Sequence, residues 1–194
     1  MKTTLKPLIA LASLALLAAG CASSSSKFYT LNATATAVSP ADAHYTVAVG
    51  PVLIPAEVDR PQFTVQVAPN RVALDEFNRW AAPLNDNIAS VVAANLSALL
   101  GTSRVTATAL ANFTADYQVS LNLQRFESVP GKAVTVAAIW VVKPAHGVAI
   151  SGQTVAEVPV ADASFDALAA AHSQALAKVS TDIAAAIRAV VNGS

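Results

Sequence analysis

Few residues of this 194-residue chain have the types and spacing that catalysis requires. The three histidines, His44, His146 and His172, are scattered with no metal-ligand spacing, so we expect them at the surface or in local hydrogen bonds. No G-x-S-x-G elbow for a nucleophilic serine occurs. The adjacent acids Asp75 and Glu76 would suit a hydrolase only if burial separated their pKa values, and such pairs usually face solvent or cap a turn. The sequence therefore predicts no catalytic residue, no metal site, no cofactor and no enzyme.

The only cysteine, Cys21, indicates a different chemistry. Two lysines precede a short apolar run from Leu8 to Ala19, as in a secretory signal. The following residues, Leu17-Ala18-Ala19-Gly20-Cys21, resemble the lipobox of bacterial lipoproteins, in which lipid is attached to the cysteine after cleavage. We therefore predict lipidation at Cys21. By resemblance to the lipoprotein sorting rule, Ala22 directs the protein to the inner leaflet of the outer membrane, facing the periplasm.

The same boundaries set the domain organisation. Residues 1–20 are predicted as the signal peptide, 21–27 as a lipidated tether with a serine run, and 28–194 as one periplasmic domain. After Cys21 no apolar run approaches the roughly 20 residues of a membrane-spanning helix.

Charge excludes one class of partner. The chain has 12 basic and 12 acidic side chains, and removal of Lys2 and Lys6 with the signal leaves 10 against 12, a net charge of −2. Because no basic stripe interrupts the sequence, nucleic acid is not an expected partner.

Apolar periodicity predicts a series of strands interrupted by one helix and closed by another. Pro83 and Gly101 bracket the first helix, and Ser164 as N-cap with Asp166 in the first turn begins the second. The predicted elements are strand 45–49, interrupted by Gly50-Pro51 and followed by an irregular exit over 52–55, a hairpin of 63–67 and 71–74, helix 84–100, strands 105–107, 117–123, 134–142 and 148–158, and a helix from Ser164 to Asn192-Gly193.

The strand 134–142 is apolar on both faces, which predicts a central strand covered on each side, with Trp140 in the core. Gly152 in the next strand indicates a bulge. Together the elements predict an α/β fold with a mixed sheet flanked by two main helices.

Two clusters are too particular to be explained by packing alone. The first runs Val49-Gly50-Pro51-Val52-Leu53-Ile54-Pro55 and then Asp59-Arg60-Pro61-Gln62; the second is Glu76-Phe77-Asn78-Arg79-Trp80-Ala81-Ala82-Pro83-Leu84. With these clusters the sequence resembles the PqiC/YmbA-type auxiliary lipoproteins of ABC transport systems, which share a V-G-P-V…P…D-R-P-Q stretch and an R-W-A-x-P-L stretch before a helix. The specific match covers roughly residues 47–101.

This resemblance implies a three-layer α/β domain similar to the N-terminal domain of TolB. It also implies an auxiliary subunit of an MCE-type lipid-transport system, which would dock an MCE-domain periplasmic protein and through it an inner-membrane ABC permease and ATPase. The candidate partner-binding residues are Asp59, Arg60, Gln62, Arg79 and Trp80.

Their roles stay open at this point. Arg60 could form an ion pair with Asp59 or a neighbouring acid, or recognise a partner, and Trp80 could be a core plug or a binding hot spot with Arg79. A lipid carrier with an apolar pocket between sheet and helices is the alternative function, an envelope hydrolase has little support, and self-association is plausible.

Overall fold

The computed structural model describes residues 25–37, 44–107 and 113–193. The predicted signal 1–20, the lipidation site Cys21 and Ala22 lie outside the described residues. The described elements comprise two sheets and two helices, so the expected α/β class is confirmed.

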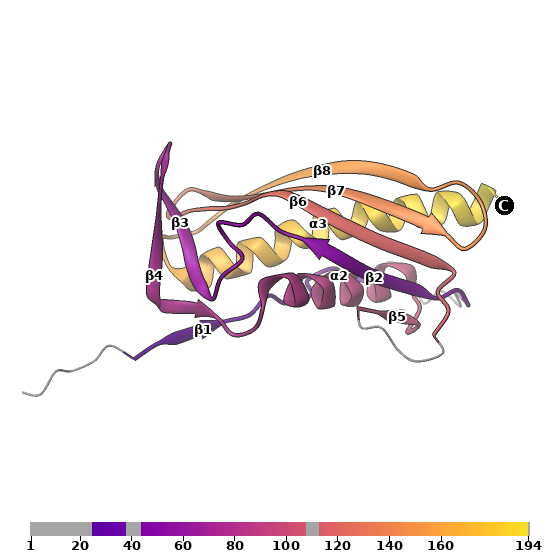
Figure 1. The fold of residues 1–194 in the computed structure, drawn as a ribbon, viewed down its shortest axis with the longest axis horizontal. Helices are drawn as coiled ribbons and strands as arrows, with labels where there is room; N and C mark the ends of the chain where they lie inside the picture. Colours follow the sequence, from indigo (N-terminus) through magenta and orange to yellow (C-terminus); the bar gives the residue numbers. More distant parts are fainter. Residues whose placement is uncertain (1–24, 38–43, 108–112, 194) are drawn as a thin grey trace, which may run out of the picture.

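The larger sheet has five strands in the order β5-β2-β6-β7-β8 (Figure 1). Its members are β2 (Val47–Leu53), β5 (Val105–Thr106), β6 (Tyr117–Val129), β7 (Ala133–Pro144) and β8 (Ile150–Pro159). β2 runs parallel to β5 and β6, whereas β6, β7 and β8 form an antiparallel meander. The mixed sheet expected from the sequence is therefore present.

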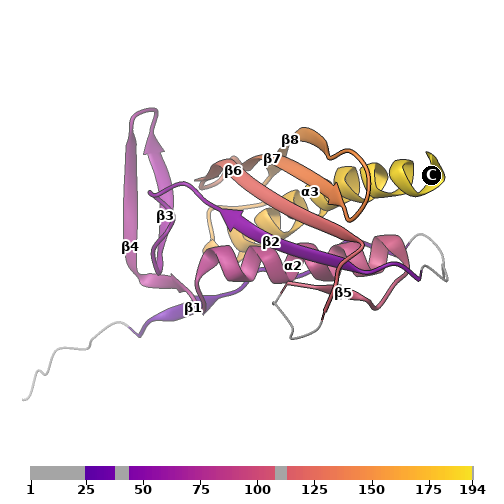
Figure 2. The same cartoon turned by 45° about the vertical axis from the view of Figure 1, so that its right-hand side comes forward.

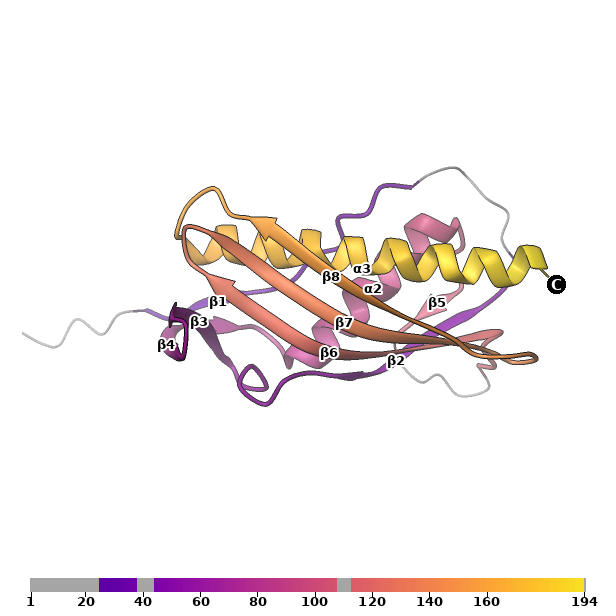
Figure 3. The ribbon, with the colours of Figure 1, turned by 90° about the horizontal axis from the view of Figure 1, so that it is seen from above.

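Both helices cover the same face of this sheet. The helices α2 (Leu84–Leu100) and α3 (Phe165–Gly193) pack against each other, and their contacts with the sheet are those of α2 with β2 and of α3 with β7 and β8. Viewed from above, the two helices lie on one side of the strands (Figure 3). The large sheet and the helix pair thus make two layers, where three were expected.

The opposite face of the sheet is partly open. On β7 the outward-facing side chains include Ile139, which is 42% exposed, and Ala137, which is buried; on β8 Val155 is 57% exposed. The expectation that 134–142 is covered on both sides was therefore wrong at Ile139. Trp140 points to the helices and is buried, as predicted.

A smaller three-stranded sheet forms one end of the molecule, and the chain enters the fold at this end (Figure 2). Its strands are β1 (Lys27–Tyr29), β3 (Gln62–Ala68) and β4 (Arg71–Trp80), in the order β1-β4-β3. β3 and β4 form the predicted hairpin, and β1 adds to β4 in parallel. The predicted hairpin is confirmed, with a second strand that extends to Trp80.

The helix boundaries follow local signals. α2 begins after Pro83, and Gly101 ends it with φ 69° while its N–H donates to the carbonyl of Ser97 at 3.0 Å. The Ser164 hydroxyl accepts the N–H of Ala167 at 3.1 Å, which confirms the predicted N-cap of α3.

Gly152 does not mark a bulge. The β7–β8 pairing runs through Trp140 and Gly152 without a register shift. A Cβ on Gly152 would clash with Cζ2 of Trp140, so glycine is required because the indole covers its α-carbon.

The chain after β1 is held to α2 by two asparagine side chains. The Oδ1 atom of Asn87 accepts the N–H of Leu31 at 2.8 Å, and that of Asn95 accepts the N–H groups of Thr34 and Ala35, both at 3.0 Å. Asn95 is fully buried. These bonds satisfy backbone donors that no strand partner reaches.

Candidate functional site

The two motif clusters, which are separate in the sequence, meet at the small sheet. Gln62 is in register with Arg79, and the N–H of Trp80 donates to the carbonyl of Pro61 at 2.7 Å. On the other side of β4, Phe28 of β1 is in register with Arg79. The hairpin register therefore brings the Asp59–Gln62 and Arg79–Leu84 segments side by side.

A groove of about 440 Å³ opens between these segments. Its lining is mostly apolar, with two arginines and one aspartate; it consists of Phe28, Asp59, Arg60, Pro61, Arg79, Trp80, Ala81, Ala82, Pro83 and Leu84. Such a site can bury a few side chains of a partner while charged groups orient them. Asp59, Arg60, Arg79 and Trp80, four of the five candidate residues, lie in this one groove.

The fifth candidate, Gln62, is not among the groove's lining residues. Its Nε2 atom donates to Oε2 of Glu76 on β4 at 3.3 Å, so it links the two strands of the hairpin. Gln62 therefore lies next to the groove but does not line it.

Arg60 does not form an ion pair, which was one of the two roles that the sequence left open. Its Nη2 atom donates to the carbonyl of Ala56 at 3.3 Å. Within residues 25–37, 44–107 and 113–193 the only ion pair closer than 4.0 Å joins Arg125 to Glu127. One main-chain bond leaves most of the Arg60 guanidinium's five donors free to meet a ligand in the groove.

Trp80 is mainly a core residue. It is 5% exposed, and its ring stacks on Phe63 with the centroids 4.4 Å apart and packs edge-on against Phe126 at 6.1 Å. Trp80 is also one of the residues that line the groove. Packing therefore fixes the indole, and a contribution of Trp80 to binding stays a prediction.

A bulge in β4 lies close to the groove. Phe63 pairs with Asp75 and Gln62 with Arg79, so residues 76–78 have no partner on β3. The Oδ1 atom of Asp75 accepts the N–H groups of Phe77 at 2.9 Å and of Asn78 at 2.7 Å. Desolvation acts to raise the pKa of the Asp75 carboxyl, but these bonds and one from the Asn78 side chain outweigh it and hold that pKa below its ordinary value. Asp75 thus holds the backbone of a bulge inside β4, and not a turn at a strand end as the sequence suggested.

The placement of His172 corrects the sequence interpretation. His44 and His146 are exposed, but His172 is fully buried on α3, where its ring stacks on Phe126 with centroids 3.8 Å apart. Its Nε2 atom lies 2.7 Å from Oγ of Ser128, whereas Nδ1 has no partner among the described residues. Burial lowers the pKa of His172 to about 3. The helical row Leu168, His172, Leu176, at intervals of four residues, was the signal that could have placed it in the core.

This Ser–His pair is not arranged for nucleophilic catalysis. Ser128 is 2% exposed, so a substrate cannot reach its hydroxyl, and no described carboxylate contacts the free ring nitrogen of His172. In the part of the chain that the structure describes, no group of three His, Cys, Asp or Glu side chains could hold a metal ion. The groove, with its mostly apolar lining and two arginines, has a composition suited to binding.

Solved structures share this fold. A protein described only as uncharacterized has a TM-score of 0.71 at 20% sequence identity, over 84% of this chain and 99% of its own. Protein XCC0632 from Xanthomonas campestris, assigned to family DUF330, has a TM-score of 0.63 at 21% identity, over 81% of this chain and 92% of its own. No protein with a curated description matches the sequence. At these identities the similarities establish the class of fold.

The family follows from the sequence. Residues 29–184 match the family of ABC-type transport auxiliary lipoprotein components, and the chain belongs to this family, in agreement with the PqiC/YmbA-type resemblance of its two clusters. Such a component assists a transport system and is not itself an enzyme. Among the described residues, no helix is both long and apolar enough to cross a membrane.

Proposed function

We propose that this protein is held at the inner leaflet of the outer membrane by lipid on Cys21. There it would serve an intermembrane lipid-transport system by docking that system's MCE-domain periplasmic component. The family supports an auxiliary role in ABC-type transport. Gly20-Cys21 and Ala22 support the anchor and its membrane.

The observation that carries the docking role is the convergence of both clusters on one groove. Pro61, Pro83 and Leu84 give it apolar walls, and Arg60 and Arg79 add positive charge. Among the described residues the Arg79 guanidinium has neither a hydrogen-bond nor an ion-pair partner. Arginine next to an aromatic edge in a concave site is typical of binding hot spots.

The lipid-carrier alternative has weaker support. It requires an apolar pocket between the large sheet and the helices, but that interface is occupied by the buried side chains of β6, β7 and α3. Three grooves, of 620, 440 and 110 Å³, lie around the small sheet and the adjoining end of β6.

A pull-down from crosslinked envelopes tests docking, with the lipidated protein as bait. The groove variant is Arg60→Glu/Arg79→Glu, and Lys132→Glu/Lys143→Glu makes the same charge change at exposed positions outside the groove. A second variant, Ala82→Trp, fills the groove at an exposed position without altering the core. We expect the parent and the lysine control to recover an MCE-domain protein, and recovery to fall about tenfold or more with either groove variant, equivalent to a loss of at least about 1.4 kcal/mol.

Two results would contradict this proposal. Equal recovery of the MCE-domain protein by parent and groove variants would place docking on another surface. Recovery of lipid in defined stoichiometry, with no transporter subunit, would favour the carrier.

A further inference from the structure

The small sheet exposes an unusual share of apolar surface. Among the described residues the large apolar side chains that this sheet leaves exposed are Phe28, Val67, Val72, Leu74 and Phe77. They lie at the end of the molecule where the chain enters the fold (Figure 1). Exposed apolar residues gathered in one region mark an interaction surface.

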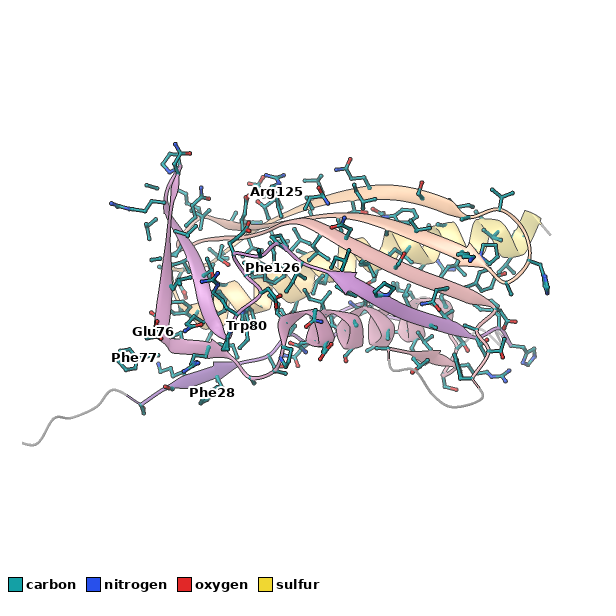
Figure 4. All side chains as sticks on the ribbon, viewed as in Figure 1. Phe28, Glu76, Phe77, Trp80, Arg125 and Phe126 are labelled. Carbon is teal, nitrogen blue, oxygen red and sulfur yellow. The ribbon has the colours of Figure 1, made fainter. Side chains whose placement is uncertain are left out.

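Phe77 is held in its exposed position by the bulge in β4. The Asp75 carboxylate fixes the backbone of Phe77 and Asn78, and the Asn78 side chain accepts the Tyr29 hydroxyl at 2.7 Å. Phe77 is left 47% exposed and points away from the sheet (Figure 4). Bulges commonly re-aim side chains in this way. Because several hydrogen bonds maintain a ring that faces solvent, core packing does not account for it.

Phe28 is exposed for a complementary reason. In β1 the side chains alternate, so Tyr29 packs edge-on against Phe63 with centroids 5.8 Å apart while Phe28 faces outward, 65% exposed. Lys27, the preceding residue, is also exposed. On β4, the register partner of Phe28 is Arg79. The outer edge of the small sheet thus combines two phenyl rings with two cations.

The length of the tether indicates what covers this edge. Six residue steps join Cys21 to Lys27, and an extended chain spans at most about 3.5 Å per residue, so β1 begins within roughly 20 Å of the anchoring lipid. Aromatic rings and cations are the side chains that favour the interfacial zone of a bilayer.

We infer that Phe28 and Phe77 rest in the interfacial region of the leaflet that holds the anchor, with Lys27 directed to lipid phosphates. The inference rests on the proposed lipidation of Cys21. The anchor then fixes distance, and the two rings fix orientation. The docking groove, which shares Phe28 and Arg79 with this edge, opens next to the membrane surface.

Quenching by brominated lipid tests this orientation in the full lipidated protein. Trp80 and Trp140 are buried, so a single added indole provides the exposed probe. The variants are Phe28→Trp and Phe77→Trp, and Val155→Trp on β8, 57% exposed, is the matched control. Each is reconstituted in vesicles of phosphatidylethanolamine and phosphatidylglycerol, with or without bromine on the acyl chains.

We expect bromine to reduce the emission of the indoles at positions 28 and 77, each with a blue shift, and to leave Val155→Trp at the level of the parent. Adding Phe77→Ser to Phe28→Trp should reduce the quenching at position 28, because the rings act together. Equal quenching at positions 28, 77 and 155, or none at 28 and 77, would overturn the inference.

The two proposals fail separately. Phe77 does not line the groove, so Phe77→Ser should still recover the MCE-domain protein in the pull-down. If the groove variants lose docking and positions 28 and 77 are quenched, both the docking site and the membrane orientation are supported. If positions 28 and 77 are quenched but the groove variants dock fully, only the docking site is rejected.

Discussion

Lowering the pH from 7 to 5 should destabilise the folded protein through one side chain, His172. Its burial holds its pKa at about 3 in the folded state, against 6.5 when it is exposed. Below pH 6.5 the unfolded chain gains a proton there that the folded chain does not accept, so the free energy of unfolding falls with pH until about pH 3. Between pH 7 and pH 5 this linkage amounts to about 2 kcal/mol.

Other shifted groups do not obscure this interval. The carboxyl pKa values of Asp75, Asp116 and Asp162 are lowered from 3.8, so the stability that those carboxylates contribute is lost only below about pH 4. A slope between pH 7 and pH 5 therefore reports on histidine.

Urea unfolding, followed by the fluorescence of the two buried tryptophans, measures this slope at pH 7, 6 and 5. The test variant is His172→Phe/Ser128→Ala, which keeps a ring against Phe126 and removes both partners of the 2.7 Å contact, so that no polar atom is left unpaired. The control is His146→Gln, at an exposed position. We expect the parent and the control to lose about 2 kcal/mol and the test variant to lose almost none. The same slope in all three proteins would refute the reasoning.

Three further predictions concern packing and polar contacts. Gly152→Ala places a methyl group against the Trp140 ring and should cost roughly 1–3 kcal/mol in urea unfolding, whereas an unchanged midpoint would mean that the indole moves freely. Asn95→Ala leaves the part-buried N–H groups of Thr34 and Ala35 unpaired, so we expect the free energy of unfolding to fall by about 1–3 kcal/mol and proteolysis within residues 30–36 to become faster. Cleavage at the rate of the parent would contradict this prediction. Asp116→Ala removes the acceptor of the Thr46 N–H and hydroxyl, whose bonds lower the pKa of the Asp116 carboxyl. The melting temperature of the variant should be lower than that of the parent at pH 7 and should fall less steeply than that of the parent below pH 4. Melting temperatures that fall in parallel for variant and parent would contradict this prediction.

Local signals predicted the elements well because each depends on neighbouring residues. Pro83 and Gly101 set the ends of α2, and Ser164 set the start of α3. The layering could not be predicted in the same way. An apolar residue such as Ile139 on the outer face of β7 has the same sequence pattern whether a helix covers it or solvent does.

The candidate site was partly predictable. A hairpin centred near residue 69 places the two clusters on neighbouring strands, and in the structure Arg60 and Arg79 line one groove. The three-residue bulge that sets their register depends on the Asp75 carboxylate, and Phe28 enters the groove through a parallel pairing that spans about 50 residues. Neither the bulge nor the β1–β4 pairing produces a periodic pattern in the sequence, so neither could be predicted from it.

The parallel pairing of β1 with β4 also has a mechanical consequence. A tension on the tether pulls β1 from its N-terminal end, along the strand, so the hydrogen bonds to β4 resist in shear and are strained together. If β1 detached from β4, the next bonds under load would be those that the Asn87 and Asn95 side chains of α2 accept from the chain after β1. A pull on the N-terminal end of β1 would thus be resisted first by β4 and then by α2, so the segment before β1 can be taut without unravelling the strand it leads into.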